Sequence, residues 1–242
     1  MIVIAGDSHC NALGRALDDS ENADVAGLKT RFGAIAVRTI LSGNRFQQPF
    51  FRLQDDAITF EFGAHKFFAE MTGTDGCIRR GDPNYYVFSM GFHPTILVRQ
   101  EFWKDFTILS GVSGKNFVSA AAFAALVREE NKHVINFAKS LKALQISCVF
   151  VIAPSIRQAM IDRQKKYAEA AELISVHRNF VGVMRSEFDA IGMPYLSPPE
   201  TTEESGILKQ AYDIKSATDV HHANTAFGSL TLREIARNAF TP

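Results

Sequence analysis

Short apolar runs alternate with longer amphipathic stretches along most of this chain. Four of the runs are apolar and rich in β-branched or aromatic residues, as buried strands are, and a shorter fifth run follows late in the sequence. The five predicted strands cover residues 1–5, 34–41, 85–90, 146–153 and 193–196. This alternation predicts an α/β protein with a mostly parallel sheet covered by helices on both faces.

The amphipathic stretches carry apolar residues at helical spacing. The predicted helices cover residues 11–17, 117–144, 157–191 and, at the end of the chain, about 225–237. We expect the third of these to break near Asn179 or Gly182.

Residues 44–84 interrupt the alternation and are unusually rich in phenylalanine. We predict that they form an insertion that covers one edge of the sheet and could wall a pocket. With no repeats, no low-complexity tract and no convincing linker, the sequence predicts one domain over residues 1–242.

Composition narrows the class of protein. Lys+Arg 26 balance Asp+Glu 26, so no overall field would recruit nucleic acid or an anionic membrane. The three cysteines, Cys10, Cys77 and Cys148, lack the spacing of a zinc site or a disulfide framework. The N-terminal sequence does not resemble a signal peptide, and no apolar stretch has the length of a membrane span. We therefore expect a cytoplasmic protein.

Polar residues follow several predicted strands directly, at the edge where open α/β sheets gather their functional groups. The first strand runs into Gly6-Asp7-Ser8-His9. Two chemistries suit this turn, a serine nucleophile on Ser8 and a metal-binding pair of Asp7 and His9. The rest of the chain must supply the partners that each chemistry needs.

A serine nucleophile needs a base within hydrogen-bond reach. His222 can supply it, and Asp219, three residues earlier, can accept from the imidazole Nδ1–H and fix its tautomer. The free N–H groups and positive dipole of the first helix N-terminus would stabilise an oxyanion formed at Ser8.

These motifs resemble the SGNH (GDSL) hydrolase superfamily. GDSH at residues 6–9 matches its nucleophile block, and DVHHAN at residues 219–224 matches its DxxH block. The resemblance implies a flavodoxin-like three-layer sandwich, a catalytic set of Ser8, Asp219 and His222, and neither metal nor cofactor. Asn224 and Gly228 also agree with residues that often follow the family's histidine.

The family's remaining oxyanion donors match less well. Gly43 is a candidate for the glycine whose backbone N–H donates. The family's Gly-x-Asn reads Gly91-Phe92-His93 here, so His93 or Asn44 would have to replace the asparagine. Loss of one such donor can cost roughly 3 kcal/mol of transition-state stabilisation.

The metal alternative resembles calcineurin-like metallophosphoesterases, in which an Asp and a His of the first block hold one ion of a pair. Two-metal chemistry needs further ligands on later strand ends. The GNH block of that family would fall at Gly43-Asn44, where Arg45 replaces the histidine, and its GHxH block has no equivalent. We therefore expect no metal site.

The sequence thus favours a serine esterase, acylhydrolase or acyltransferase acting on a small ester, such as an O-acetyl group on a carbohydrate. The alternative from another class is a binding protein with the same fold that has lost catalysis with its oxyanion asparagine. Nucleic acid and membranes are not expected partners, and the sequence leaves the oligomeric state open.

Overall fold

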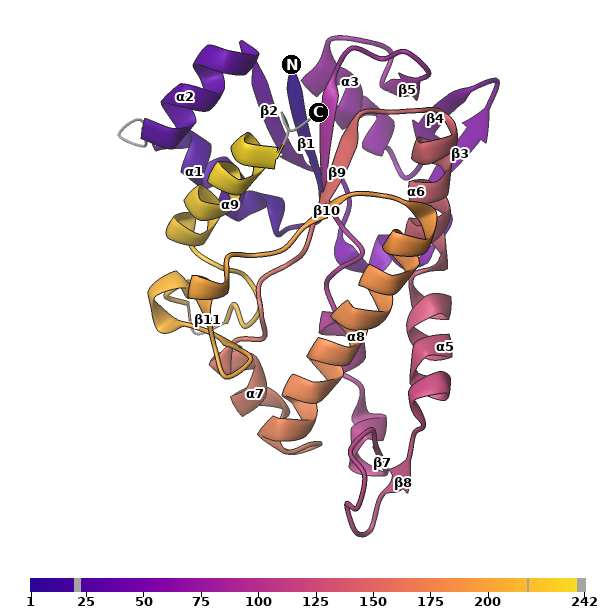
Figure 1. Ribbon diagram of the computed structural model, residues 1–242, viewed down its shortest axis with the longest axis vertical. Coiled ribbons are helices and arrows are strands. Elements are labelled where there is room, and N and C mark those ends of the chain that lie inside the picture. Colours follow the sequence, from indigo (N-terminus) through magenta and orange to yellow (C-terminus); the bar gives the residue numbers. More distant parts are fainter. Residues whose placement is uncertain (20–22, 217, 239–242) are drawn as a thin grey trace.

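A five-stranded parallel sheet forms the centre of the protein in a computed structural model that describes residues 1–19, 23–216 and 218–238. The strand order is β10-β9-β6-β1-β2, and every neighbouring pair is parallel (Figure 1). The strands are β1 (Ile2–Gly6), β2 (Ile35–Thr39), β6 (Tyr85–Ser89), β9 (Cys148–Val151) and β10 (Tyr195–Leu196). The predicted flavodoxin-like α/β architecture is confirmed.

Helices cover both faces of this sheet, and the alternating side chains of β1 divide the core between them. Ile2 and Ile4 pack toward α1, α2 and α9, whereas Val3 and Ala5 belong to the larger cluster beneath the other helices. The first layer contains α1 (Cys10–Asp18), α2 (Ala23–Phe32) and α9 (Thr225–Asn238). The second contains α3 (Ala64–Thr72), α5 (Ala120–Glu130), α6 (Lys132–Ala143) and α8 (Ala170–Ile191).

The register of the sheet brings the ends of its central strands into line. Gly6, the last residue of β1, pairs with Thr39 of β2 and with Ser89 of β6. A Cβ atom on Gly6 would lie 2.0 Å from the Ser89 carbonyl oxygen, so only glycine fits here. The turns that follow these strands therefore meet at one edge.

Two helix predictions need correction. The single helix expected over residues 117–144 is two helices, because Asn131 (φ −112°, ψ 13°) leaves helical geometry between α5 and α6 and its side chain bonds the Val127 carbonyl. The break expected near Asn179 or Gly182 lies earlier, between α7 (Gln158–Gln164) and α8. Gly182 is exposed on α8, where the helix tolerates it.

Residues 44–84 hold a small antiparallel sheet, β3-β4-β5, which lies apart from the central sheet. Its phenylalanines are divided: Phe50, Phe60 and Phe68 are buried, whereas Phe62 and Phe67 are exposed. The elements of this segment are η1 (Gly43–Gln47), β3 (Phe51–Gln54), β4 (Ala57–Phe60), α3 and β5 (Cys77–Arg79).

Short elements complete the chain. They are α4 (Thr95–Val98), η2 (Glu101–Lys104), β7 (Phe106–Thr107), β8 (Asn116–Phe117), η3 (Glu200–Thr202), β11 (Glu203–Glu204), β12 (Ile207–Leu208) and η4 (Gln210–Tyr212). Among the described residues, no helix combines the length and the apolar character needed to cross a membrane.

Candidate active site

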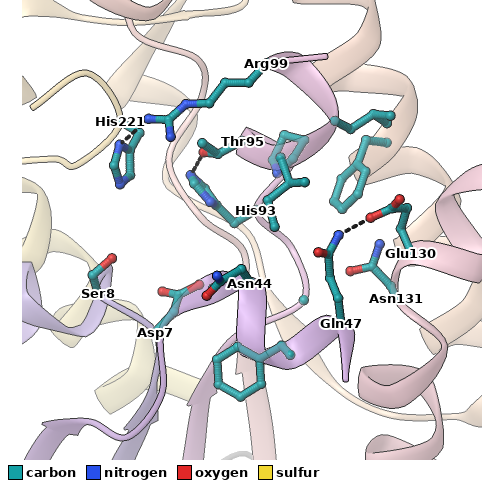
Figure 2. A pocket seen from close by; sticks show the side chains of 17 residues that line it. Asp7, Ser8, Asn44, Gln47, His93, Thr95, Arg99, Glu130, Asn131 and His221 are labelled. Carbon is teal, nitrogen blue, oxygen red and sulfur yellow. Dashed lines mark hydrogen bonds between the residues drawn. The ribbon is translucent and has the colours of Figure 1, made fainter. Parts of the chain in front are cut away.

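A cavity of about 300 Å³ opens at the edge where the strands of the central sheet end. Four of the six predicted site residues, Ser8, Gly43, Asn44 and His93, line it. Figure 2 shows Ser8, His93 and His221 projecting into it from three segments that are distant in the sequence. The tertiary structure therefore joins the turns that follow β1, β2 and β6.

Ser8 lies in a tight turn between β1 and α1. The Asp7 carboxylate accepts a hydrogen bond from the His9 backbone N–H at 2.9 Å, and the Asp7 carbonyl accepts one from the Cys10 N–H. These bonds fix the turn that presents Ser8 at the N-terminus of α1. Cys10 itself is fully buried, and burial raises the pKa of its thiol, so it is a packing residue.

The structure brings Ser8, His222 and Asp219 into one chain of hydrogen bonds. His222 Nε2 lies 2.6 Å from Ser8 Oγ, and His222 Nδ1 lies 2.8 Å from Asp219 Oδ2. Burial disfavours the Asp219 carboxylate, but hydrogen bonds from the backbone and ring of His222 outweigh it and lower the Asp219 pKa to about 2. An ionised Asp219 can only accept, so Nδ1 carries the proton and Nε2 faces the Ser8 hydroxyl as an acceptor.

Arg157 holds the loop that carries Asp219, although no motif in the sequence marks this arginine. Its buried guanidinium donates to the Asp219 carbonyl at 2.5 Å and to the Ile214 carbonyl at 3.1 Å, and it forms an ion pair with Asp213. Its position just after the 146–153 strand was the available signal, since functional groups gather at such ends.

Asn224 and Gly228, which follow His222 in the sequence, fix the other side of that loop. Asn224 donates to the carbonyls of Ala211 and Asp213 and accepts from the Phe227 N–H, which caps α9. Gly228 lies against α1, where a Cβ would be 2.1 Å from the Ala12 carbonyl oxygen. This close packing of α9 on α1 sets the distance between His222 and Ser8.

The predicted oxyanion donors differ in whether they already have a hydrogen-bond partner. Among the described residues, the backbone N–H groups of Ser8 and Gly43 have no acceptor. The Asn44 carbonyl oxygen takes a bond from the Ser42 hydroxyl at 2.6 Å, which leaves the amide N–H groups of Asn44 for the cavity. His93 Nε2 lies 2.5 Å from the Thr95 hydroxyl, so one of its two ring nitrogens is engaged (Figure 2).

Four of the seven histidines in the chain pack together at this site. The ring centroids of His9 and His93 are 3.9 Å apart, and those of His221 and His222 are also 3.9 Å apart. Burial, followed by the neighbouring imidazoles, holds the pKa of His9 and His93 well below the usual range and lowers that of His221 to about 4. His221 contacts Arg99, whereas His222 is the histidine that contacts Ser8.

Part of the cavity wall is polar and was not predicted. It includes Arg99, Asn131 and a hydrogen-bonded pair of Gln47 and Glu130 (Figure 2). These residues come from η1, the end of α4 and the junction of α5 and α6, so no local motif connects them. The apolar residues Phe46, Ile96, Leu97 and Phe180 line the same cavity, so polar and apolar groups both face a ligand there.

Solved structures of similar architecture include a GDSL-like lipase from Bacteroides thetaiotaomicron, with 11% identity, a TM-score of 0.50 and coverage of 98% of this chain and 86% of that one. An acetyl xylan esterase matches with 12% identity, a TM-score of 0.47 and coverage of 98% and 100%. A variant of an acetyl-xylooligosaccharide esterase from Geobacillus stearmophilus matches with 12% identity, a TM-score of 0.47 and coverage of 100% and 94%.

No family model matches the chain, and no curated protein matches it. The likeness shows that the chain shares the fold of that GDSL-like lipase, in agreement with the fold that the two end motifs predicted.

Proposed function

We propose that the protein is a serine hydrolase that cleaves a small ester through an acyl-enzyme on Ser8. The observation that carries this proposal is the hydrogen-bond chain from Ser8 Oγ through His222 to Asp219. Its geometry lies within the reach that a nucleophile and its base require. The shared fold with a GDSL-like lipase supports the same class of reaction.

In the first half of the reaction, Ser8 Oγ attacks the ester carbonyl carbon and its proton passes to His222 Nε2. The tetrahedral intermediate collapses, the C–O bond to the alcohol breaks, and His222 returns the proton to the leaving oxygen. Water then attacks the acyl-enzyme with His222 again as base, which releases the acid and restores Ser8. Asp219 stays ionised throughout and stabilises the imidazolium.

The oxyanion would be held by the backbone N–H groups of Ser8 and Gly43 and by the side-chain amide of Asn44. In this arrangement, Asn44 would supply the third donor that the asparagine of the Gly-x-Asn motif usually provides. Asn44 is the better candidate than His93 for the third position, because its oxygen is already turned toward Ser42. His93 in turn is engaged with Thr95.

The cavity volume of about 300 Å³ and the polar side chains in part of its wall favour a short acyl group on a polar alcohol, such as an O-acetyl ester of a carbohydrate. An alcohol in place of water in the second half would give acyl transfer. The rival function is ligand binding without turnover, in a protein whose incomplete oxyanion site no longer supports the reaction.

A fluorophosphonate probe separates these functions. We expect covalent labelling of the wild-type protein and hydrolysis of p-nitrophenyl acetate, with both lost in Ser8→Ala and His222→Ala. Ser186→Ala is the matched control, since the Ser186 hydroxyl bonds the Gly182 carbonyl on the exposed side of α8 and should leave labelling unchanged. Folded protein that neither labels nor hydrolyses the ester would overturn the proposal in favour of the binding function.

A further inference from the structure

Three histidines that the proposed reaction leaves without a role meet beside Ser8. His9 follows Ser8 directly, His93 stands where the family has asparagine, and His221 precedes the base. The ring centroids are 3.9 Å apart for His9 and His93, 5.5 Å for His93 and His221, and 5.8 Å for His9 and His221. The sequence left Asp7 and His9 without further ligands downstream, and the tertiary structure places His93 against them.

The first trio has the donor types and spacing of a metal site. One carboxylate oxygen of Asp7 and one ring nitrogen each of His9 and His93 lie within 4.8 Å of one another. Asp7 is 4% exposed and His9 is 8% exposed, so both donors are held away from bulk water. Imidazole nitrogen and carboxylate oxygen together suit zinc and its neighbours in the first transition row.

These buried donors also lack partners of their own. His9 Nε2 is buried with no hydrogen-bond partner among the described residues. The Asp7 carboxylate, too, has no ion-pair partner among the residues that the structure describes, and it accepts a hydrogen bond only from the His9 backbone N–H. A buried carboxylate without a countercharge and an unpaired imidazole nitrogen both cost free energy, which a bound cation would offset.

We propose that Asp7, His9 and His93 bind one divalent transition-metal ion, zinc in the first instance, with water as the fourth ligand. Zinc bonds of 2.0–2.2 Å in a tetrahedron separate the ligand atoms by roughly 3.4 Å. Closing the present spacing to that value needs only small side-chain rotations. The site does not depend on Ser8 being reactive.

A second trio, Asp219, His221 and His222, has its ligand atoms within the same distance of one another. Its donors are already used, since Asp219 accepts from two backbone N–H groups, from Arg157 and from the His222 ring. His222 Nε2 faces Ser8. In the first trio, the contact of His93 Nε2 with Thr95 leaves the other nitrogen of that ring, and His9 Nε2 has no partner among the described residues, so this trio has donors left for an ion.

The test is zinc titration of the full chain, stripped by a chelator, followed by calorimetry, with the visible spectrum of the cobalt(II) form as a second readout. We expect one ion per chain. Removal of an outer-shell partner weakens a metal site about 10–100-fold, so loss of a ligand in His93→Asn or His9→Leu should raise the Kd at least about tenfold. The matched control is His133→Gln, on the surface of α6, which should bind zinc like the wild type.

His222→Gln separates this proposal from the proposed function. It should still bind zinc although it loses fluorophosphonate labelling. If the wild type binds no zinc, or if His93→Asn and His9→Leu bind it as tightly as the wild type, the site is wrong. Loss of binding in His222→Gln with retention in His93→Asn would assign the ion to the second trio instead. Should His9→Leu fail to fold, His93→Asn carries the test alone.

Discussion

Ser8 Oγ and His222 Nε2 lie 2.6 Å apart although 214 positions separate the two residues in the chain. The contact depends on two anchors, the packing of α9 on α1 through Gly228 and the buried guanidinium of Arg157 beneath the loop of Asp219. Arg15 of α1 adds a third, since it donates to the Ala223 carbonyl at 3.0 Å. The loop is therefore held from both ends.

Asp219→Asn tests whether the carboxylate orients the base. An amide at this position can donate to His222 Nδ1 and so favour the tautomer that puts the proton on Nε2, where it blocks proton transfer from Ser8. We expect turnover of p-nitrophenyl acetate to fall about 10⁴-fold with folding intact. Asp162→Asn, on the exposed side of α7, is the control. Activity of Asp219→Asn within tenfold of the wild type would speak against the assigned role.

Arg157→Met tests the anchor beneath the loop. Its removal leaves Asp213 and two carbonyl groups without their buried partner, and we expect a loss of about 3–5 kcal/mol in the free energy of unfolding. Arg178→Met removes an exposed partner of Glu203 and should cost less than about 1 kcal/mol. Urea unfolding of the two variants measures the difference. Equal losses would mean that Arg157 does not secure the loop.

Asp7→Asn tests the cost of the buried carboxylate, with a chelator present. Burial raises the Asp7 pKa from 3.8 to about 7, so the folded state holds this proton more tightly than the unfolded state. The stability gained by binding this proton is present in full below about pH 4 and is lost as the pH rises through 7. The variant keeps the acceptor for the His9 N–H, and we expect it to gain up to about 4 kcal/mol at pH 8.

The matching control for Asp7→Asn is the pH dependence itself. Unfolding free energies of the wild type and the variant, measured from pH 4 to pH 8, should diverge steadily as the pH rises. Parallel curves would show that the Asp7 carboxyl does not titrate in this range.

Gly228→Ala tests the contact between α9 and α1. A methyl group would meet the Ala12 carbonyl oxygen at 2.1 Å, and the helices would have to separate, at a cost of about 1–3 kcal/mol. Gly182→Ala places the same methyl on α8 with no atom within 4 Å, and there we expect a gain of about 0.5–1 kcal/mol. Thermal unfolding compares the two. We also expect Gly228→Ala to slow fluorophosphonate labelling, because His222 moves with α9.

The pattern of apolar positions was enough to predict the architecture. Buried strands leave continuous apolar runs and helices leave apolar residues at a period of 3.6, so each element has a local signal, and the parallel sheet follows from the alternation of the two. The motifs at residues 6–9 and 219–224 also predicted the fold, because each is a continuous stretch that can be recognised without knowing the tertiary structure. The ends of helices were harder to predict: at the end of α5, both the backbone N–H and the side chain of Asn131 bond the Val127 carbonyl, and no apolar periodicity marks that position.

What the sequence could not determine is which side chains meet. Arg157, Arg99 and the pair of Gln47 and Glu130 leave no local pattern, because their partners come from other elements of the chain. The sequence likewise left Asp7 and His9 without partners, whereas the structure sets His93 beside them. Local periodicity determines the elements, but only long-range packing of the sheet and its helices brings residues such as Ser8 and His222 together at one edge.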